Sequence, residues 1–175
     1  MSLKSLIRTI PDYPKAGILF RDITTLLLDA RGFREAVDGL VQPFREARIH
    51  KVAGIEARGL ILGGAVALEL GAGFAPVRKR GKLPWETVGE DYQLEYGSDR
   101  VEMHRDAVSP GERVLLVDDL VATGGTAEAA IRVIQKLGGE IVGCAVIIDL
   151  PALGGSRRIA ALGHPIVSLV EFEGE

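Results

Sequence analysis

Two adjacent carboxylates and a glycine-rich turn lie close together in the segment LLVDDLVATGGT, residues 115–126. An apolar run leads into Asp118 and Asp119, and two residues further on the chain enters ATGGT. Backbone N–H groups that converge at the start of a helix bind phosphate, and glycines let the backbone approach the anion closely. Carboxylates would repel that phosphate, but they accept hydrogen bonds from the vicinal hydroxyls of a ribose. The segment therefore predicts a pocket for a ribose 5-phosphate.

The same segment also has a purely structural interpretation. The glycines could form a tight turn with an N-capping threonine, and the two acids could cap that turn. Two other phosphate-binding patterns do not fit, because the chain lacks the P-loop sequence GxxxxGK[ST] and has no GxGxxG after a strand. The other elements of the chain must decide between a turn and a site.

Short apolar runs alternate along the chain with segments that have helical spacing. Such an alternation is typical of parallel strands that are buried on both faces and joined by helices. The predicted fold class is therefore α/β, an open and mostly parallel sheet flanked by helices. The expected strands cover residues 52–55, 74–77, 114–117, 141–148 and 166–170, and the expected helices cover 33–48, 60–70 and 126–137. Pro43 must kink the first helix or begin a new turn.

Charged or glycine-rich loops follow three of the expected strands. Ligands of such sheets bind at the carboxyl ends of the strands, so these loops should meet at one edge. EARG follows the first strand, RKRGK follows the second, and the acidic pair with ATGGT follows the third. The arginine fork matches phosphate oxygens, although a run of basic residues is more often a solvated surface. The polar region that follows Gly81 predicts a mobile hairpin or lid over the strand ends, or else a surface excursion without a role.

Composition limits the class of protein. The chain has 175 residues, a net charge of −3 and 47% hydrophobic residues, as expected for one globular domain. Nucleic-acid and membrane binders are usually basic overall, and no apolar run approaches the roughly 20 residues that span a bilayer. Cys144 is the single cysteine, which excludes an intrachain disulfide. These features predict a soluble, cytoplasmic protein with no nucleic-acid or membrane partner.

The segment LLVDDLVATGGT resembles the motif that binds 5-phosphoribosyl 1-pyrophosphate (PRPP) in the type I phosphoribosyltransferases. Four further stretches, DYPKAGILFRD, EARG, RKRGKLP and LEYG, resemble in order and spacing the members of that family that use adenine. The similarity extends from about residue 13 to residue 172. Each motif is short, but five motifs in the same order are hard to obtain by chance.

The resemblance implies transfer of the phosphoribosyl group from PRPP to adenine, which gives AMP and pyrophosphate through an oxocarbenium-like transition state. It also implies a homodimer and a single domain, 1–175, with an N-terminal base-binding hood (residues 1–32) and a mobile lid (residues 81–107). Mg²⁺ is expected to bind through PRPP, together with Asp118 or Asp119, and not in a dedicated cage of protein ligands. The three histidines are scattered and show no metal-binding spacing.

The resemblance also assigns roles to individual residues. Glu95 of LEYG is expected to exchange a proton with the base, while Asp118 and Asp119 hold the ribose hydroxyls. Tyr96 lies over the sugar or pyrophosphate. Adenine is expected at Leu19, Phe20 and Arg21; the 5-phosphate at Ala122, Thr123, Gly124, Gly125 and Thr126; and pyrophosphate at Glu56, Ala57, Arg58, Gly59, Arg78, Lys79 and Lys82.

Two other functions remain open from the sequence. Some proteins keep this fold and its PRPP loop but act as regulators that bind nucleotides. Such a protein should lack LEYG and carry an added DNA-binding segment, whereas LEYG is present here and no helix-turn-helix pattern is visible. The other alternative is an enzyme of the same kind that uses a different base, which would differ at residues 19–21 and at Glu95.

Overall fold

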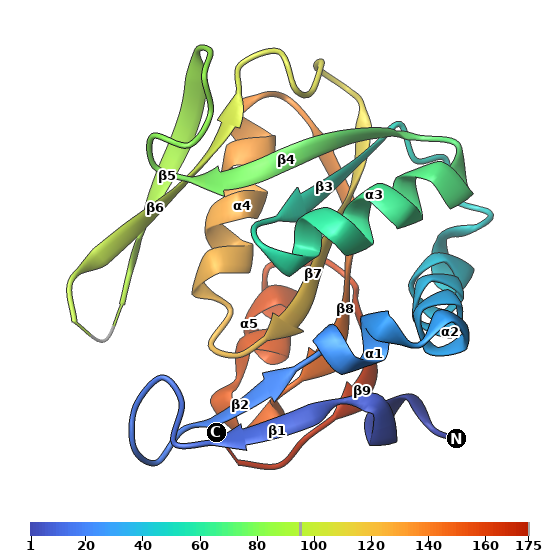
Figure 1. Ribbon diagram of the computed structural model, residues 1–175. Helices are drawn as coiled ribbons and strands as arrows, with labels where there is room; N and C mark the ends of the chain where they lie inside the picture. The colour runs from blue at the N-terminus through green and yellow to red at the C-terminus, as the bar shows by residue number, and fades with distance from the viewer. Residues whose placement is uncertain (95, 175) are drawn as a thin grey trace.

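A seven-stranded sheet forms the centre of the molecule (Figure 1). The computed structural model describes residues 1–94 and 96–174. The strands are arranged in the order β5-β6-β4-β3-β7-β8-β9, and the five from β4 to β9 run parallel, which confirms the α/β prediction. Their bounds are Lys51–Ile55 for β3, Gly73–Lys79 for β4, Thr87–Gln93 for β5, Ser98–His104 for β6, Arg113–Val121 for β7, Glu140–Asp149 for β8 and Ile166–Glu171 for β9.

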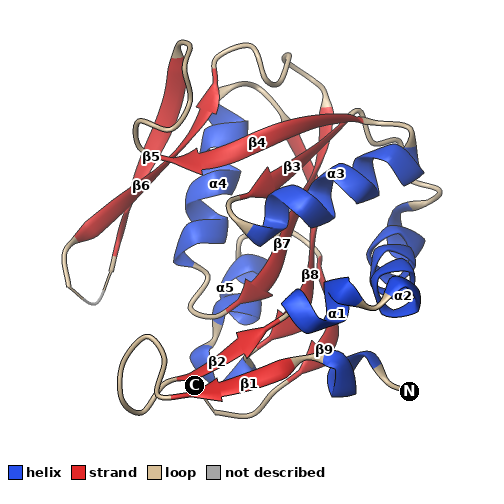
Figure 2. Ribbon diagram, viewed as in Figure 1, coloured by secondary structure: helices blue, strands red, loops and turns tan. Residues whose placement is uncertain are grey.

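Helices cover both faces of this sheet (Figure 2). The helices α1 (Thr24–Leu28), α2 (Ala30–Val41) and α3 (Arg58–Leu70) lie on one side, and α4 (Gly125–Lys136) and α5 (Gly155–Ala161) lie on the other. Alternate residues of β7 enter the two cores: Leu115 and Val117 pack toward α2 and α3, and Leu116 packs toward α4. Burial on both faces explains the uninterrupted apolar sequence of the central strands. Within residues 1–94 and 96–174, no helix is long and apolar enough to cross a membrane.

Several helix and strand ends differ from the sequence-based prediction, and two of these differences concern Pro43 and the acidic pair. The helix α2 ends at Val41, and Pro43 lies in a separate 3₁₀ turn, Gln42–Phe44, because proline fits the first turn of a helix better than its interior. The strand β7 continues to Val121, so Asp118 and Asp119 lie within the strand and not after it. Carboxylates disfavour strands, but Arg58 compensates the charge of Asp119.

The region predicted to form a lid, residues 81–107, contains an antiparallel hairpin of β5 and β6. The prediction of a hairpin is confirmed, but its place in the main sheet was not anticipated. Strand β6 pairs with β4, where Arg78 lies opposite Glu102, and Lys136 Nζ of α4 donates to the Gly89 carbonyl of β5 at 2.7 Å. The base of the lid is therefore fixed to the sheet and to α4. Glu95 lies outside the described residues.

The hood contains a second, two-stranded antiparallel sheet. A 3₁₀ turn, Leu3–Leu6, precedes β1 (Arg8–Pro11), which pairs with β2 (Leu19–Asp22). This small sheet lies beside the end of β9 and the segment that follows it, where Arg21 donates to the Glu173 carbonyl (Figure 1). The helix α1 follows directly, so β2 leads from the hood into the main domain.

Asp22 joins the hood to α1. Its carboxylate accepts hydrogen bonds from the Thr24 hydroxyl at 2.7 Å, the Thr24 N–H at 2.8 Å and the Arg8 guanidinium at 2.6 Å. Burial alone would raise the pKa of Asp22, but these hydrogen bonds outweigh it and lower the pKa to about 2. The ionised carboxylate therefore stabilises the position of β2.

We expect Asp22→Asn to destabilise the protein in a manner that depends on pH. The folded-state pKa of about 2 lies below the ordinary value of 3.8, so the stabilisation is present above about pH 4 and is lost toward pH 2. At neutral pH the free energy of unfolding should fall by about 1–2 kcal/mol, where the lower value allows for solvent screening at the exposed Arg8. Urea denaturation over a range of pH measures the difference. A constant gap between wild type and variant down to acidic pH would contradict a role for the ionised form.

Candidate active site

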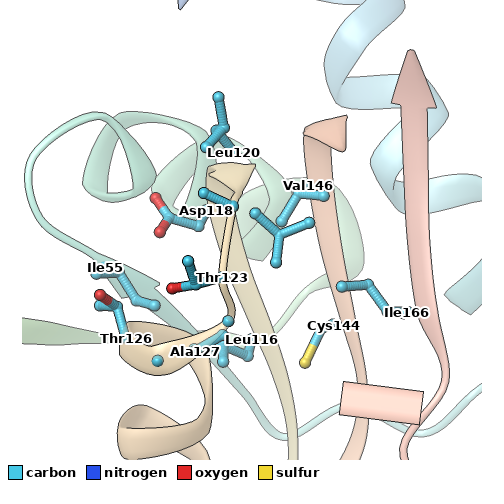
Figure 3. A pocket seen from close by; sticks show the side chains of 14 residues that line it. Ile55, Leu116, Asp118, Leu120, Thr123, Thr126, Ala127, Cys144, Val146 and Ile166 are labelled. Carbon is cyan, nitrogen blue, oxygen red and sulfur yellow. The ribbon is translucent and has the colours of Figure 1, made fainter. Parts of the chain in front are cut away.

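A cavity of about 160 Å³ opens at the carboxyl end of β7, next to the start of α4. Figure 3 shows the side-chain oxygens of Asp118, Thr123 and Thr126 on one side of it, while Cys144 and Ile166 lie on the other. The structure thus brings together the acidic strand and the ATGGT loop, as the sequence predicts. The lining residues are Ile55, Leu116, Asp118, Leu120, Val121, Ala122, Thr123, Gly124, Gly125, Thr126, Ala127, Cys144, Val146 and Ile166.

The ATGGT loop turns into α4 through a left-handed glycine. Gly124 has φ +86° and forms the N-cap of α4, which begins at Gly125. A residue with a side chain would be strained at this φ, and a Cβ there would lie 3.0 Å from Gly155 Cα. The first residues of α4 line the cavity, and the backbone N–H groups and the positive dipole end of a helix N-terminus can bind an anion.

A second glycine, Gly155 at the start of α5, contacts the backbone of the ATGGT loop. Its N–H donates to the Ala122 carbonyl at 2.9 Å. The guanidinium of Arg158, one turn further on, lies 3.4 Å from the Thr123 carbonyl and also bonds to Glu128 of α4. Sequence reasoning did not identify α5 as part of the site. The only local signal was the Gly154-Gly155 pair after an apolar strand.

The two carboxylates of β7 differ in their surroundings. Asp119 is buried, with 6% of its surface exposed, and accepts a bond from Arg58 Nε at 2.5 Å. Asp118 accepts the N–H of Asp119 at 2.8 Å. Burial, followed by the negative charge of Asp119, raises the pKa of Asp118 well above its usual range. A ligand that brings a cation or hydroxyl donors to Asp118 would favour its ionised form.

The EARG loop approaches β7 closely because it contains a glycine. A Cβ at Gly59 would lie 2.9 Å from Asp118 Oδ1 and 3.0 Å from the Val117 carbonyl. The peptide bond between Glu56 and Ala57 is cis, and Arg58 begins α3. EARG thus contacts the acidic strand, as expected for neighbouring parallel strands.

The basic segment that was predicted to follow the second strand begins inside it, because β4 continues to Lys79. Its residues contact EARG and the lid. Glu56 Oε1 accepts the N–H of Lys79 at 2.6 Å and Arg78 Nε at 3.3 Å. Lys79 Nζ bonds to Asp99 Oδ2 at 2.6 Å and to the Tyr92 hydroxyl, both in the lid hairpin. Lys82 is exposed. A direct contact of Lys79 with pyrophosphate would require it to exchange Asp99 for the ligand.

The hood contributes an aromatic side chain to the same edge of the sheet. The ring of Phe20 lies 5.6 Å from the guanidinium carbon of Arg58 and packs edge-on against Tyr13. Because Arg58 also bonds to Asp119, it links Phe20 to the carboxylate pair. Leu19 is partly exposed, at 38%. The side chain of Arg21 turns away toward Thr9, to which it donates at 2.6 Å.

The tip of the lid approaches the loop of the hood. Tyr96 is 80% exposed, and Lys15 Nζ lies 5.6 Å from the centre of its ring. Its neighbour Glu95, the residue expected to handle the proton, lies outside the described residues. In the part of the chain that the structure describes, no three His, Cys, Asp or Glu side chains gather as a metal site would require.

The chain matches a known protein family over most of its length. Residues 25–162 match the family model described as "Phosphoribosyl transferase domain". This match covers most of the chain and includes EARG, the basic loop, the acidic pair and ATGGT. The protein belongs to the phosphoribosyltransferase family.

Individual relatives extend the similarity to the whole chain. The sequence is 65% identical, over 174 residues and 99% of each chain, to adenine phosphoribosyltransferase of Maricaulis maris (strain MCS10). The fold is similar to that of adenine phosphoribosyltransferase from Rhodothermus marinus, with a TM-score of 0.93, 54% identity and coverage of 97% and 96% of the two chains. The enzyme of Saccharomyces cerevisiae, crystallised with D-2,5-dideoxy-2,5-imino-altritol 1,6-bisphosphate and adenine, has a TM-score of 0.89, with 36% identity and 96% of each chain covered.

Proposed function

We propose that the protein transfers the 5-phosphoribosyl group of PRPP to adenine and produces AMP and pyrophosphate, a purine-salvage reaction. The observation that carries the proposal is the position of Asp118 and Asp119, beside the ATGGT loop at one end of β7. The full-length relative from Maricaulis maris is an adenine phosphoribosyltransferase, and the yeast relative was crystallised with adenine and a bisphosphate. Both support adenine as the base.

The sugar phosphate of PRPP would bind along β7. Backbone N–H groups of residues 122–126 and the hydroxyls of Thr123 and Thr126 would hold the 5-phosphate. Asp118 and Asp119 would accept hydrogen bonds from the ribose hydroxyls. Loss of pyrophosphate leaves positive charge on the sugar ring, and two carboxylates fixed nearby stabilise that charge in the transition state.

Pyrophosphate would leave toward the basic side of the crevice. Arg58, at the start of α3, presents a guanidinium next to the Asp119 carboxylate, and the EARG backbone lies beside it. Arg78 near the end of β4 and Lys82 in the loop after it are further cations, and Lys79 becomes available if it releases Asp99. Positive charge placed here stabilises the negative charge that develops on the leaving group.

The donor set fits a Mg²⁺ ion that PRPP itself carries. Burial and the charge of Asp119 raise the pKa of Asp118. A cation nearby would favour the ionised form of this carboxyl group. Asp118 or Asp119 would therefore be the protein ligand, while phosphate oxygens and water supply the rest. When bound, Mg²⁺ neutralises part of the charge of the pyrophosphate.

Adenine would bind between the hood and the strand ends. Phe20 would stack on the base, with backbone groups of Leu19 and Arg21 reading its edge. Stacking contributes about 1–3 kcal/mol and accepts either purine, so hydrogen bonds to the 6-amino edge must provide the selectivity. Tyr96 and the rest of the lid would exclude water from the activated sugar.

A direct test uses PRPP, Mg²⁺ and each nucleobase in separate incubations. Chromatography should show AMP with adenine and little nucleotide with guanine, hypoxanthine or uracil. PRPP binding without product from any base would support a regulator that only binds nucleotides. Product from another base alone would show that the substrate is wrong while the class of enzyme is right.

We expect Glu95→Gln to reduce kcat by about 10²–10⁴-fold, the range typical of a lost general acid or base. Glutamine keeps the size of the side chain but cannot exchange a proton. Steady-state kinetics should show the loss in kcat, while calorimetry should find PRPP affinity within about twofold of wild type, because the residue would act on the base. Glu86→Gln, an exposed carboxylate at the start of the lid, is the control. Equal losses in turnover and PRPP affinity would argue that Glu95 is not the proton-transfer group.

We also propose that the protein is a homodimer that associates through the α2–α3 face. Two large apolar residues of α3 are exposed, Ile61 at 51% and Leu68 at 85%. Leu68 borders a surface cavity of about 310 Å³ between α2 and α3. Apolar patches of this kind often mark protein interfaces. The cavity is lined by Ala30, Phe33, Arg34, Val37, Ala65, Leu68 and Glu69.

Leu68→Lys should convert the dimer to a monomer. Sedimentation velocity at assay concentration would detect the change, since a lysine charge in an apolar interface is poorly solvated. Leu162→Lys, at another exposed leucine (41%) after α5, should leave the dimer intact. A wild-type protein that sediments as a monomer would refute the proposal, and a dimeric Leu68→Lys variant would place the interface elsewhere.

No nucleic acid or membrane is a partner in this proposal. All four participants, adenine, PRPP, AMP and pyrophosphate, are small and water-soluble. We therefore expect the protein to act in the cytoplasm, and cell fractionation would test this.

A further inference from the structure

The C-terminal segment after β9 packs against the hood, although none of its residues has a role in the function described above. The N–H of Phe172 donates to the carbonyl of Asp149 at 3.1 Å, which fixes the segment to the end of β8. Figure 1 shows the segment after β9 beside β1 and β2. The segment is therefore placed to act on the strand that would read the base.

Two cations of the hood lie near the ring of Phe172. The guanidinium carbon of Arg21 is 4.2 Å from the ring centre, and Lys4 Nζ is 4.7 Å from it. A cation over an aromatic face is attracted by the negative charge of that face, and the attraction is stronger where water is excluded. Phe172 thus attaches both the first turn of the hood and β2 to the end of the main sheet.

Arg21 depends on this contact more than a surface arginine would. Its Nη1 donates to the Thr9 hydroxyl at 2.6 Å and its Nη2 to the Glu173 carbonyl at 3.4 Å. Its Nε is buried and has no hydrogen-bond partner among the described residues. A buried donor without an acceptor is costly, and the nearby ring face of Phe172 offsets part of this cost for the guanidinium.

Packing alone does not hold the ring in place. A cavity of about 560 Å³ borders the same segment, and Lys4, Phe172 and Glu173 line it. The ring is partly buried against the main core, and with open space on its other side the two cations and the backbone bond to Asp149 also fix its position.

The position of Arg21 determines the position of Phe20. Successive residues of a strand point to opposite sides, and Arg21 faces the C-terminal segment while Phe20 lies near Arg58. Fixing the side chain of Arg21 therefore helps to set the height of β2 above the strand ends, in addition to the contacts of Asp22 at the end of the strand. That height decides how far Phe20 and the backbone of β2 stand from a base bound to the sugar at Asp119.

We propose that Phe172 is a positioning residue for the adenine site, because its ring holds Arg21 and so places β2 over the crevice. The inference rests on the proposed function, since it deepens the base site of that reaction. It gives the C-terminal segment a role in binding the nucleobase and none in binding PRPP.

Phe172→Leu in the full chain tests the proposal, because leucine keeps apolar volume but has no ring face. The KM for adenine should rise about threefold to thirtyfold, which matches the range of cation–π strengths, while kcat and the KM for PRPP stay within about twofold. Phe172→Tyr, which keeps the ring, should have the wild-type KM for adenine. Arg21→Met, which removes the cation and keeps the length, should reproduce the effect of Phe172→Leu.

The outcomes separate this inference from the proposed function. If wild type converts adenine and Phe172→Leu has an unchanged KM for adenine, the inference is wrong and the function stands. An equal rise in both KM values, or no rescue by tyrosine, would show a general structural role and also overturn it. If wild type makes no AMP, both fail. Should Phe172→Leu not fold, Arg21→Met and Phe172→Tyr give the same comparison.

Discussion

Asp119→Asn should lower kcat/KM for PRPP by about 10²–10³-fold, the loss typical of removing one preorganised electrostatic group from an active site. Asparagine has nearly the same shape, so the strand and the lining of the cavity should not change. The variant loses the negative charge that would stabilise the oxocarbenium-like sugar. It also leaves Arg58 without the carboxylate that it contacts at 2.5 Å.

The loss should divide between turnover and binding in an informative way. A weaker hydrogen bond to the ribose raises the KM for PRPP, while the missing charge near the sugar lowers kcat. Steady-state kinetics at saturating adenine, with calorimetric titration of PRPP, would measure the two parts. Asp106→Asn, an exposed acid in the turn after β6, serves as the isosteric control. A variant with wild-type kcat and wild-type PRPP affinity would remove Asp119 from the site.

The sequence was sufficient to predict the parts of the fold that depend on local burial. β3, β7 and β8 are buried on both faces, so their apolar runs were visible without any knowledge of partners. The strands of the hood were missed because β1, RTIP, is exposed at three of its four positions and contains a proline. They are held by contacts from outside the strand, such as Arg8 with Asp22. α5 was missed because it has seven residues and begins at Gly155.

The candidate site likewise contains residues that a local motif predicts and residues that only the fold brings together. Asp118 and the ATGGT loop are close in sequence, and both line the cavity at the end of β7, so one motif was enough to predict that they lie together. Asp119 does not line this cavity, because it is buried against Arg58. The pairing of Lys79 with Asp99 joins residues twenty positions apart through the lid, and no periodic pattern marks it. The contact of Phe172 with Arg21 spans almost the whole chain. Contacts of this kind depend on how distant elements pack together, which a local sequence pattern does not reveal.

Gly155 is another such case, and it leads to the second large expected effect. A Cβ at this position would lie 2.4 Å from the Ala122 carbonyl oxygen and 2.8 Å from the Gly124 nitrogen. Both atoms belong to the backbone of the ATGGT loop, so no flexible side chain can move aside. Gly155→Ala should therefore displace the loop while leaving its sequence unchanged. A displacement of about 1 Å in a binding loop can cost about 10²-fold in activity.

Displacement of the loop should weaken the binding of only those ligands that carry the 5-phosphate. Calorimetry should show about 10²-fold weaker binding of both PRPP and AMP to Gly155→Ala, whereas pyrophosphate should bind as it does to wild type. Ser156→Ala, the next residue of α5, adds no volume and should behave as wild type. Thermal denaturation would confirm that the variant is folded. If Gly155→Ala bound AMP normally, the support that α5 gives to the loop would have no part in phosphate binding. If it lost pyrophosphate equally, the damage would extend beyond the loop, and the 5-phosphate site would have to be assigned by other means.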